Sequence, residues 1–328
     1  MKRLAPLLFA LLTMLFLQAP LHAEKDSSQV RYGFESVDGV EVFFRESGDV
    51  QKPTVVLLHG FPSSSHMYRE VLSALGDEYH VIAPDYPGFG NSDFPSSDRF
   101  EYTFDHLAQV IDRFLVQRNI NQYVLMVQDY GAPVGFRIAT AHPDRVRGLI
   151  TMNGNAYEEG LGVDGWGPIF EYWKKPTAEL GEQIASQVFT LEGMKWQYTH
   201  GTRHPEALLP DTWHLDYQKI TRPGQKAMQL ALFYDYRNNV KLYPQWQQYL
   251  REHQPPTLIT WGKNDVFFPP PGAKAFLRDV PDAEIHLLDT GHFALEEEAP
   301  FIIAEMRSKN TSRTTDPLTK PCRSKSSS

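Results

Sequence analysis

The chain turns from a strand into a helix around one acidic residue, and this turn constrains the fold more than any other feature. Residues 122–127 are short, apolar and β-branched, which predicts a buried strand. Residues 132–141 predict a short apolar helix. Asp129 lies between them, at the centre of the segment 127–131. A turn of this kind exposes one side chain at the carboxyl end of a parallel sheet, so we expect a parallel α/β fold that presents a carboxylate there.

Alternating strand and helix signals flank this turn on both sides. The predicted strands are residues 55–58, 79–83, 146–152, 257–261 and 284–288. The predicted helices are residues 65–75, 102–118, 271–280 and 301–306. Two β-prone runs, 32–37 and 40–44, flank Asp38-Gly39 and predict a hairpin. The alternation as a whole predicts an open, mostly parallel sheet with helices on both faces.

The alternation stops between residues 157 and 239. This stretch is rich in Trp, Tyr, Gln and Glu, has helical periods and contains no convincing strand. It therefore predicts a helical cap inserted into the sheet domain. We divide the chain into a discontinuous core of residues 24–155 and 241–308, a cap of residues 156–240 and a disordered tail of residues 309–328. The last apolar helix is expected to stop at Arg307, before the Ser/Thr/Lys-rich tail.

The first residues of the chain have the pattern of a secretory signal. Met1-Lys2-Arg3 precedes an apolar run over residues 4–17, and Leu21-His22-Ala23 is a usable cleavage site. The alternative is a membrane anchor, but a spanning helix needs about 20 apolar residues. We therefore expect a signal peptide over residues 1–23, export to the periplasm or medium, and no stable membrane insertion after cleavage.

Charge and ligand types argue against several classes of partner. The net charge of −8 and the absence of a Lys/Arg-rich stripe argue against nucleic acid. Cys322 is the single cysteine, so the chain forms no internal disulfide. His200 and His204 have a spacing that could bind a metal, but Gly201 lies between them and no third ligand is evident. We expect no metal and no organic cofactor, and the sequence does not indicate an oligomeric state.

Three further functional groups follow predicted strands. The segment 59–62 follows one strand, and the main-chain N–H groups of Phe61 and Tyr130 are expected to form an oxyanion hole. Asp265 lies just beyond another strand. His292 lies just beyond the last one. Because parallel strands end at the same edge of a sheet, we expect these groups to meet.

Two polar residues near these groups are given structural roles. His59 is expected to brace the loop that carries the first N–H donor. Asp85 lies in Pro-Asp-Tyr-Pro-Gly-Phe-Gly and is expected to shape a Gly/Pro turn, as Asp and Asn side chains commonly do.

The order nucleophile, acid and histidine in Asp129, Asp265 and His292 resembles the α/β-hydrolase superfamily over residues 30–306. The aspartate at the turn is similar to the epoxide hydrolase and haloalkane dehalogenase branch. The resemblance implies an α/β-hydrolase fold and a two-step reaction, in which Asp129 attacks carbon and water then hydrolyses the alkyl ester. His292, oriented by Asp265, would activate this water. The implied partners are a small hydrophobic electrophile and water.

Departures from the pattern of the branch favour an epoxide over a halide. Tyr130 replaces the tryptophan that helps to hold a halide in dehalogenases. Phe61 stands where many dehalogenases have asparagine. A halide would therefore meet few hydrogen-bond donors. Val127 occupies a position that usually carries a small residue because the turn is crowded.

Two strings in the cap resemble the segments that carry the ring-opening tyrosines of epoxide hydrolases. By that match, Tyr172 in residues 170–176 and Tyr236 in residues 233–238 would donate to the epoxide oxygen. The alternative is that both tyrosines only pack the cap. We therefore expect an enzyme that opens epoxides to vicinal diols. A haloalkane dehalogenase and a non-catalytic ligand binder on this scaffold are the other hypotheses.

Overall fold

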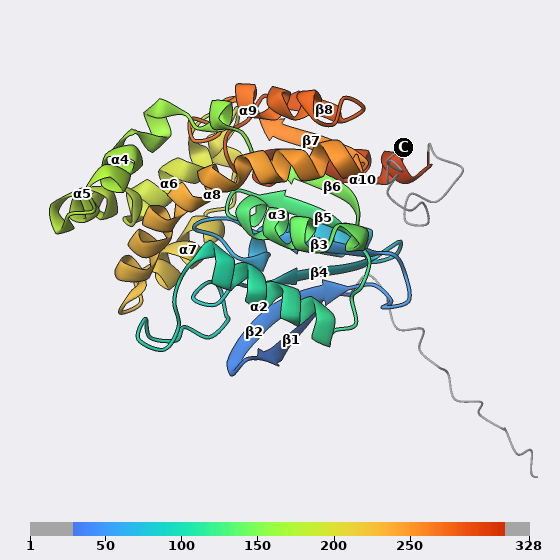
Figure 1. The fold of residues 1–328 in the computed structure, drawn as a ribbon, viewed down its shortest axis with the longest axis horizontal. Coiled ribbons are helices and arrows are strands. Elements are labelled where there is room, and N and C mark those ends of the chain that lie inside the picture. Colours follow the sequence, from blue (N-terminus) through green and yellow to red (C-terminus); the bar gives the residue numbers. More distant parts are fainter. Residues whose placement is uncertain (1–28, 312–328) are drawn as a thin grey trace, which may run out of the picture.

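The structure, a computed structural model, describes residues 29–311 of the 328-residue chain. The predicted signal peptide and residues 312–328 of the predicted tail lie outside the described residues. A central sheet carries helices on both faces, and a group of helices lies beyond one end of it (Figure 1). In the part of the chain that is described, no helix is long and apolar enough to cross a bilayer.

The sheet has eight strands in the order β1-β2-β4-β3-β5-β6-β7-β8. β2 pairs antiparallel with β1 and β4, and all pairs from β4 to β8 are parallel. The strands are β1 (Arg31–Val37), β2 (Val40–Ser47), β3 (Thr54–Leu58), β4 (His80–Pro84), β5 (Tyr123–Gln128), β6 (Val146–Met152), β7 (Thr257–Gly262) and β8 (Glu284–Leu288). The predicted mostly parallel sheet is confirmed.

The hairpin between β1 and β2 follows from its turn residues. Val37 pairs with Val40, so the loop contains only Asp38 and Gly39. Both residues have a positive φ, 51° for Asp38 and 82° for Gly39. A two-residue hairpin of this type requires positive φ at both positions, which Asp-Gly adopts readily. The predicted hairpin is confirmed.

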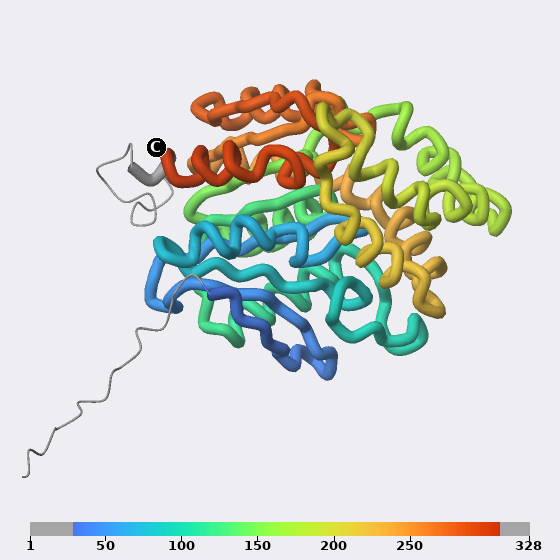
Figure 2. The backbone as a smooth tube through the Cα atoms, turned by 180° about the vertical axis from the view of Figure 1, so that it is seen from behind, coloured from blue at the N-terminus to red at the C-terminus, as the bar shows by residue number. Residues whose placement is uncertain are grey.

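Within residues 29–311, five α-helices belong to the two layers around the sheet, and five form or join the insert. The helices of the layers are α1 (Arg69–Leu75), α2 (Phe104–Gln117), α3 (Gly131–Ala141), α9 (Pro270–Ala275) and α10 (Ala294–Thr311). The helices after β6 are α4 (Val163–Lys174), α5 (Ala178–Val188), α6 (Leu191–Thr199), α7 (Asp211–Ile220) and α8 (Gln225–His253). α2 and α3 cover one face of the sheet, whereas α1 and α10 cover the other (Figures 1 and 2).

The insert is helical and lies between β6 and β7, in agreement with the predicted helical insertion. α8 is longer than the sequence suggests. It continues past residue 240, which was predicted to be the end of the cap. Its second half packs along α3 in the layer of the core. α10 also differs from expectation: it continues to Thr311, whereas the sequence predicted an end at Arg307.

The turn between β5 and α3 is crowded, and glycines make room for it. A Cβ atom on Gly131 would lie 2.1 Å from the carbonyl oxygen of Leu58 in β3. Val127, which stands where a small residue is usual, fits because Gly135 and Gly154 face its methyl groups. A Cβ atom on either glycine would approach those methyl groups to 2.7 Å and 3.1 Å, respectively. The bulk at position 127 is therefore accommodated by the absence of side chains opposite it.

This crowding predicts a difference between two glycine substitutions. We expect Gly131→Ala to lower the free energy of unfolding by about 1–3 kcal/mol, because the new methyl group meets rigid backbone. Gly167→Ala in α4 is the control, since a Cβ atom there would have no other atom within 4 Å, and it should cause no loss. Urea unfolding at pH 7 measures both; equal stability of the two variants would contradict the packing argument.

Candidate active site

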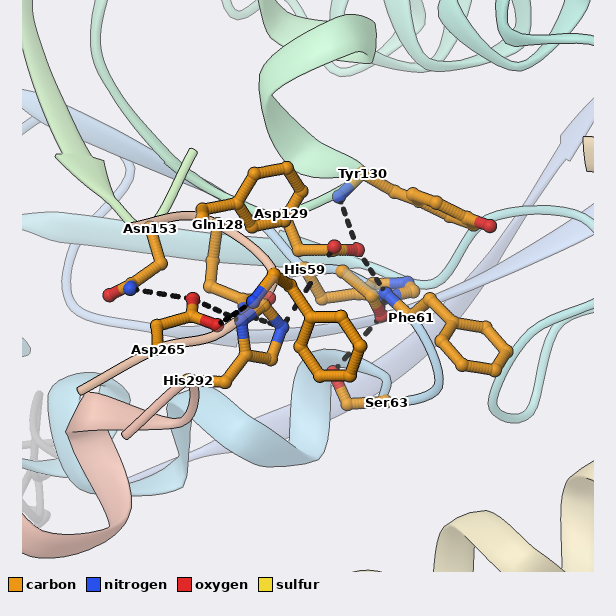
Figure 3. A network of polar contacts seen from close by, with 12 residues as sticks. His59, Phe61, Ser63, Gln128, Asp129, Tyr130, Asn153, Asp265 and His292 are labelled. Carbon is orange, nitrogen blue, oxygen red and sulfur yellow. Dashed lines mark hydrogen bonds and ion pairs between the residues drawn. The ribbon is translucent and has the colours of Figure 1, made fainter. Parts of the chain in front are cut away.

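Asp129 is held at the turn in a strained and buried position. Its φ is 48°, in the left-handed region that residues other than glycine rarely adopt. The residue is only 6% exposed. One carboxylate oxygen, Oδ1, accepts hydrogen bonds from the main-chain N–H of Phe61 at 2.7 Å and of Tyr130 at 2.6 Å (Figure 3). The two predicted oxyanion donors thus converge on one oxygen and leave Oδ2 for other contacts.

His292 and Asp265 lie beside this carboxylate. His292 Nε2 is 3.8 Å from Asp129 Oδ2, and His292 Nδ1 is 2.7 Å from Asp265 Oδ2. Asp265 follows β7, and His292 lies between β8 and α10. The structure therefore brings together the three side chains that the sequence placed after separate strands. An aspartate, a histidine and a second aspartate in this arrangement can form a covalent ester and then hydrolyse it.

Asn153 holds the second aspartate, and the sequence analysis did not identify it. It follows β6 and has a φ of 47°. Its Nδ2 donates to Asp265 Oδ2 at 2.8 Å, and its Oδ1 accepts from the main-chain N–H of Gly262 at 2.9 Å. The other oxygen of Asp265 accepts from the N–H of Phe267 at 2.8 Å. An Asn directly after a buried strand, beside a strand that carries the nucleophile, is the signal that could have indicated this role.

Burial and neighbouring charges set the protonation of the pair. Burial raises the pKa of Asp129 to about 6, and His292 and the two N–H donors limit the rise. Burial lowers the pKa of His292, but the charges of Asp265 and Asp129 outweigh this effect and raise it overall. Above pH 6, Asp129 is therefore mainly ionised, as a nucleophile must be.

An apolar cavity of about 290 Å³ opens above Asp129 and His292. Its wall combines core residues such as Phe61 and Phe267 with insert residues such as Trp166 and Phe233. The indole N–H of Trp166 donates to the carbonyl of Phe267 at 3.0 Å, which joins the insert to the core and occupies that donor. The cavity fits a small hydrophobic substrate.

The two tyrosines expected to open a ring are not in the cavity wall. Tyr172 packs against the ring of Tyr234, 5.8 Å away. Tyr236 is fully buried, with its ring 4.4 Å from that of Trp166. Burial and the neighbouring Tyr243 raise its pKa well above the usual value. This placement differs from the expectation. The two cap segments that resemble epoxide hydrolases identified helices, but they did not indicate which face of each helix points into the cavity.

His59 and Asp85 have the structural roles that the sequence suggested. His59 is buried, its Nδ1 lies 3.0 Å from the carbonyl of Gly60, and its Nε2 accepts from the N–H of Tyr86. The carboxylate of Asp85 accepts from the main-chain N–H of Ser65 at 2.7 Å and of Asn91 at 2.8 Å. Both residues therefore hold loops at the edge of the site.

Within residues 29–308, one group of side chains has the spacing of a metal site. It consists of Glu284, His286 and Glu305, on β8 and α10. None of the three lines the cavity above Asp129.

Comparison with known proteins agrees with this architecture. The sequence profile of the family described as "alpha/beta hydrolase fold" matches residues 53–299. The protein belongs to the α/β-hydrolase family. The chain is 43% identical to an uncharacterized hydrolase of Saccharomyces cerevisiae over 271 residues, which is 82% of this chain and 93% of the yeast protein.

More distant relatives carry two named activities. Haloalkane dehalogenase 2 of Mycobacterium tuberculosis is 29% identical over 268 residues, 77% of this chain and 85% of that protein. The crystal structure of epoxide hydrolase VrEH1 from Vigna radiata superimposes with a TM-score of 0.68 at 21% identity, over 88% of this chain and 100% of that chain. The homologues and structural neighbours of this hydrolase thus include haloalkane dehalogenases and epoxide hydrolases.

The raised pKa of Asp129 predicts how its replacement changes stability with pH. A carboxyl group whose pKa is higher in the folded state stabilises the fold at low pH, and this contribution is lost as the pH rises through about 6. Asp129→Asn removes the buried charge and keeps an oxygen for both N–H donors. We expect the variant to be more stable than the wild type by about 1–3 kcal/mol at pH 8. The gain should shrink toward zero at pH 4.

Chemical denaturation at the two pH values measures this difference. The difference between variant and wild type at each pH cancels the effects of pH elsewhere in the chain, because both proteins share all other titrating groups. A gain of the same size at both values, or a loss at pH 8, would show that burial does not destabilise the carboxylate.

Proposed function

We propose that this hydrolase opens epoxides to vicinal diols through a covalent ester on Asp129. The observation that carries the proposal is the asymmetric setting of the Asp129 carboxylate. Oδ1 accepts both main-chain N–H bonds, whereas Oδ2 lies 3.8 Å from His292 Nε2 below an apolar cavity. A carboxylate held in this way can attack saturated carbon, and the histidine beside it can serve the second step.

The reaction proceeds in two balanced steps. In the first, Oδ2 of Asp129 forms a bond to an epoxide carbon, the C–O bond of the ring breaks, and the ring oxygen takes up a proton. In the second, water attacks the carbonyl carbon of the ester and gives a proton to His292. The N–H groups of Phe61 and Tyr130 hold the oxyanion, each for about 3 kcal/mol in comparable sites. Collapse expels the diol oxygen, which takes the proton from His292. The carboxylic acid left on Asp129 then ionises, and its proton replaces the one given to the ring oxygen.

The ring oxygen needs a proton donor above Asp129. Of the two cap tyrosines, Tyr236 is the nearer candidate, because its ring packs on Trp166 and Trp166 lines the cavity. Tyr236 can donate a proton to the ring oxygen only when the Trp166 side chain shifts on substrate binding. Tyr172 lies against Tyr234 and would need a larger rearrangement.

Dehalogenation of an alkyl halide is the second candidate, favoured by the similarity to a named dehalogenase over most of that protein's length. Against it, the indole N–H of Trp166 is already bonded to the carbonyl of Phe267 and does not offer a halide donor. A ligand binder without activity is the third hypothesis, and the close triad argues against it.

We also propose export, on the sequence of residues 1–23 alone.

Mass spectrometry of a stalled ester separates the two electrophiles. We expect His292→Gln to accumulate an adduct on the peptide that contains Asp129, because the base for ester hydrolysis is gone. An epoxide adds its whole mass, whereas an alkyl halide adds its mass less that of the hydrogen halide. His292→Gln combined with Asp129→Asn is the control and should give no adduct. Adducts from halides alone, or on another residue, would contradict the proposal.

The tyrosine assignment is tested separately. Tyr236→Phe should lower epoxide turnover by about 10²-fold or more, the usual contribution of a positioned acid, and should leave halide release unchanged. Tyr234→Phe is the matched control on the same helix. Full epoxide turnover in Tyr236→Phe and in Tyr172→Phe would exclude both tyrosines as the acid and leave the Asp129 step intact.

A further inference from the structure

Gln128 has an unusual contact with the histidine of the site. It is the last residue of β5, directly before Asp129, and its side chain is fully buried. Its Nε2 lies 3.0 Å from His292 Nε2, the nitrogen that must take a proton from water (Figure 3). Nothing in the sequence pattern singled out this glutamine, and the reaction described above does not use it.

The partners of the imidazole fix the direction of this hydrogen bond. Asp265 accepts at His292 Nδ1, 2.7 Å away, so in the neutral ring the proton is on Nδ1. Nε2 then has a lone pair, and the amide of Gln128 donates to it. The charged groups that face the ring are Asp129 and Asp265, and the rings of Phe267, Phe268 and Phe293 pack around it.

The other end of the amide is buried without a hydrogen-bond partner. Gln128 Oε1 has no partner among the described residues. It lies against Gly60, where a Cβ atom would approach Oε1 to 2.3 Å. Glycine at position 60 therefore makes room for the amide. A buried acceptor without a partner costs stability, and such a cost is commonly retained where the group acts in another state of the site.

We propose that Gln128 is a positioning residue for the hydrolysis of the Asp129 ester: its amide holds the neutral His292 ring before water arrives and, after turning over, holds the imidazolium. The inference rests on the proposed function. Water first displaces the Gln128 amide N–H from the Nε2 lone pair of His292. When this water attacks the ester carbonyl, a new C–O bond forms, its O–H bond breaks, and the proton moves to His292 Nε2. The amide N–H of Gln128 and the new N–H of His292 Nε2 would then point at each other, and neither could accept a hydrogen bond. A half turn of the amide presents Oε1 instead, which accepts from Nε2 until the proton leaves with the alcohol.

Two substitutions test this role in the full-length protein. Gln128→Leu removes both the donor and the acceptor. In single-turnover experiments with styrene oxide, we expect ester formation to continue at the wild-type rate. Ester hydrolysis should slow about tenfold, the rate equivalent of one lost hydrogen bond. A purely structural role would slow both steps together, and equal slowing, or no slowing, overturns the proposal.

Gln128→Glu tests the same contact without catalysis. A carboxylate can accept from the imidazolium but cannot donate to neutral His292, so the titration of His292 should move up by about one pH unit or more. ¹⁵N-histidine NMR measures this shift, and the spectrum of His292→Gln assigns the signal. An unchanged titration overturns the proposed contact. If the wild type forms no ester, the proposed function fails, and the NMR result alone then decides whether Gln128 holds His292.

Discussion

The two main-chain N–H bonds to Asp129 Oδ1 are the contact on which the rest of the site depends. They require the loop after β3 to touch the turn after β5, and they are possible because Gly60 and Gly131 leave space for that approach. They also keep a buried carboxylate partly ionised, since they offset part of the cost of burial.

The other polar groups form a chain of contacts away from this carboxylate. Asn153 holds Asp265, Asp265 holds His292, and His292 faces Asp129. Each member follows a different strand of the parallel part of the sheet, so sheet register sets their spacing. The insert adds a mostly apolar roof, which also includes Asp164. The core therefore carries the polar groups that react, and the helices of the insert determine which substrate shapes fit the cavity.

The sequence predicted those parts of the molecule that depend on local pattern. Asp129, Asp265 and His292 were found because each follows a short apolar strand, and strand ends meet at one edge of the sheet. Asn153 and Gln128 were missed: the position of Asn153 after a strand is a weak signal on its own, and the contact of Gln128 with His292 is visible only in three dimensions. The tyrosines of the insert illustrate the same limit. Helical periodicity identifies a helix, but the direction of one ring depends on packing with Trp166 and other distant side chains.

In the proposed reaction Asp129, rather than a free water molecule, attacks the substrate. A single turnover of excess enzyme with an epoxide in H₂¹⁸O tests it directly, with the oxygen isotopes of product and enzyme read by mass spectrometry. We expect the first diol to carry no ¹⁸O and the label to enter the peptide that contains Asp129, because water attacks the ester carbonyl. A labelled diol with an unlabelled Asp129 peptide would contradict it.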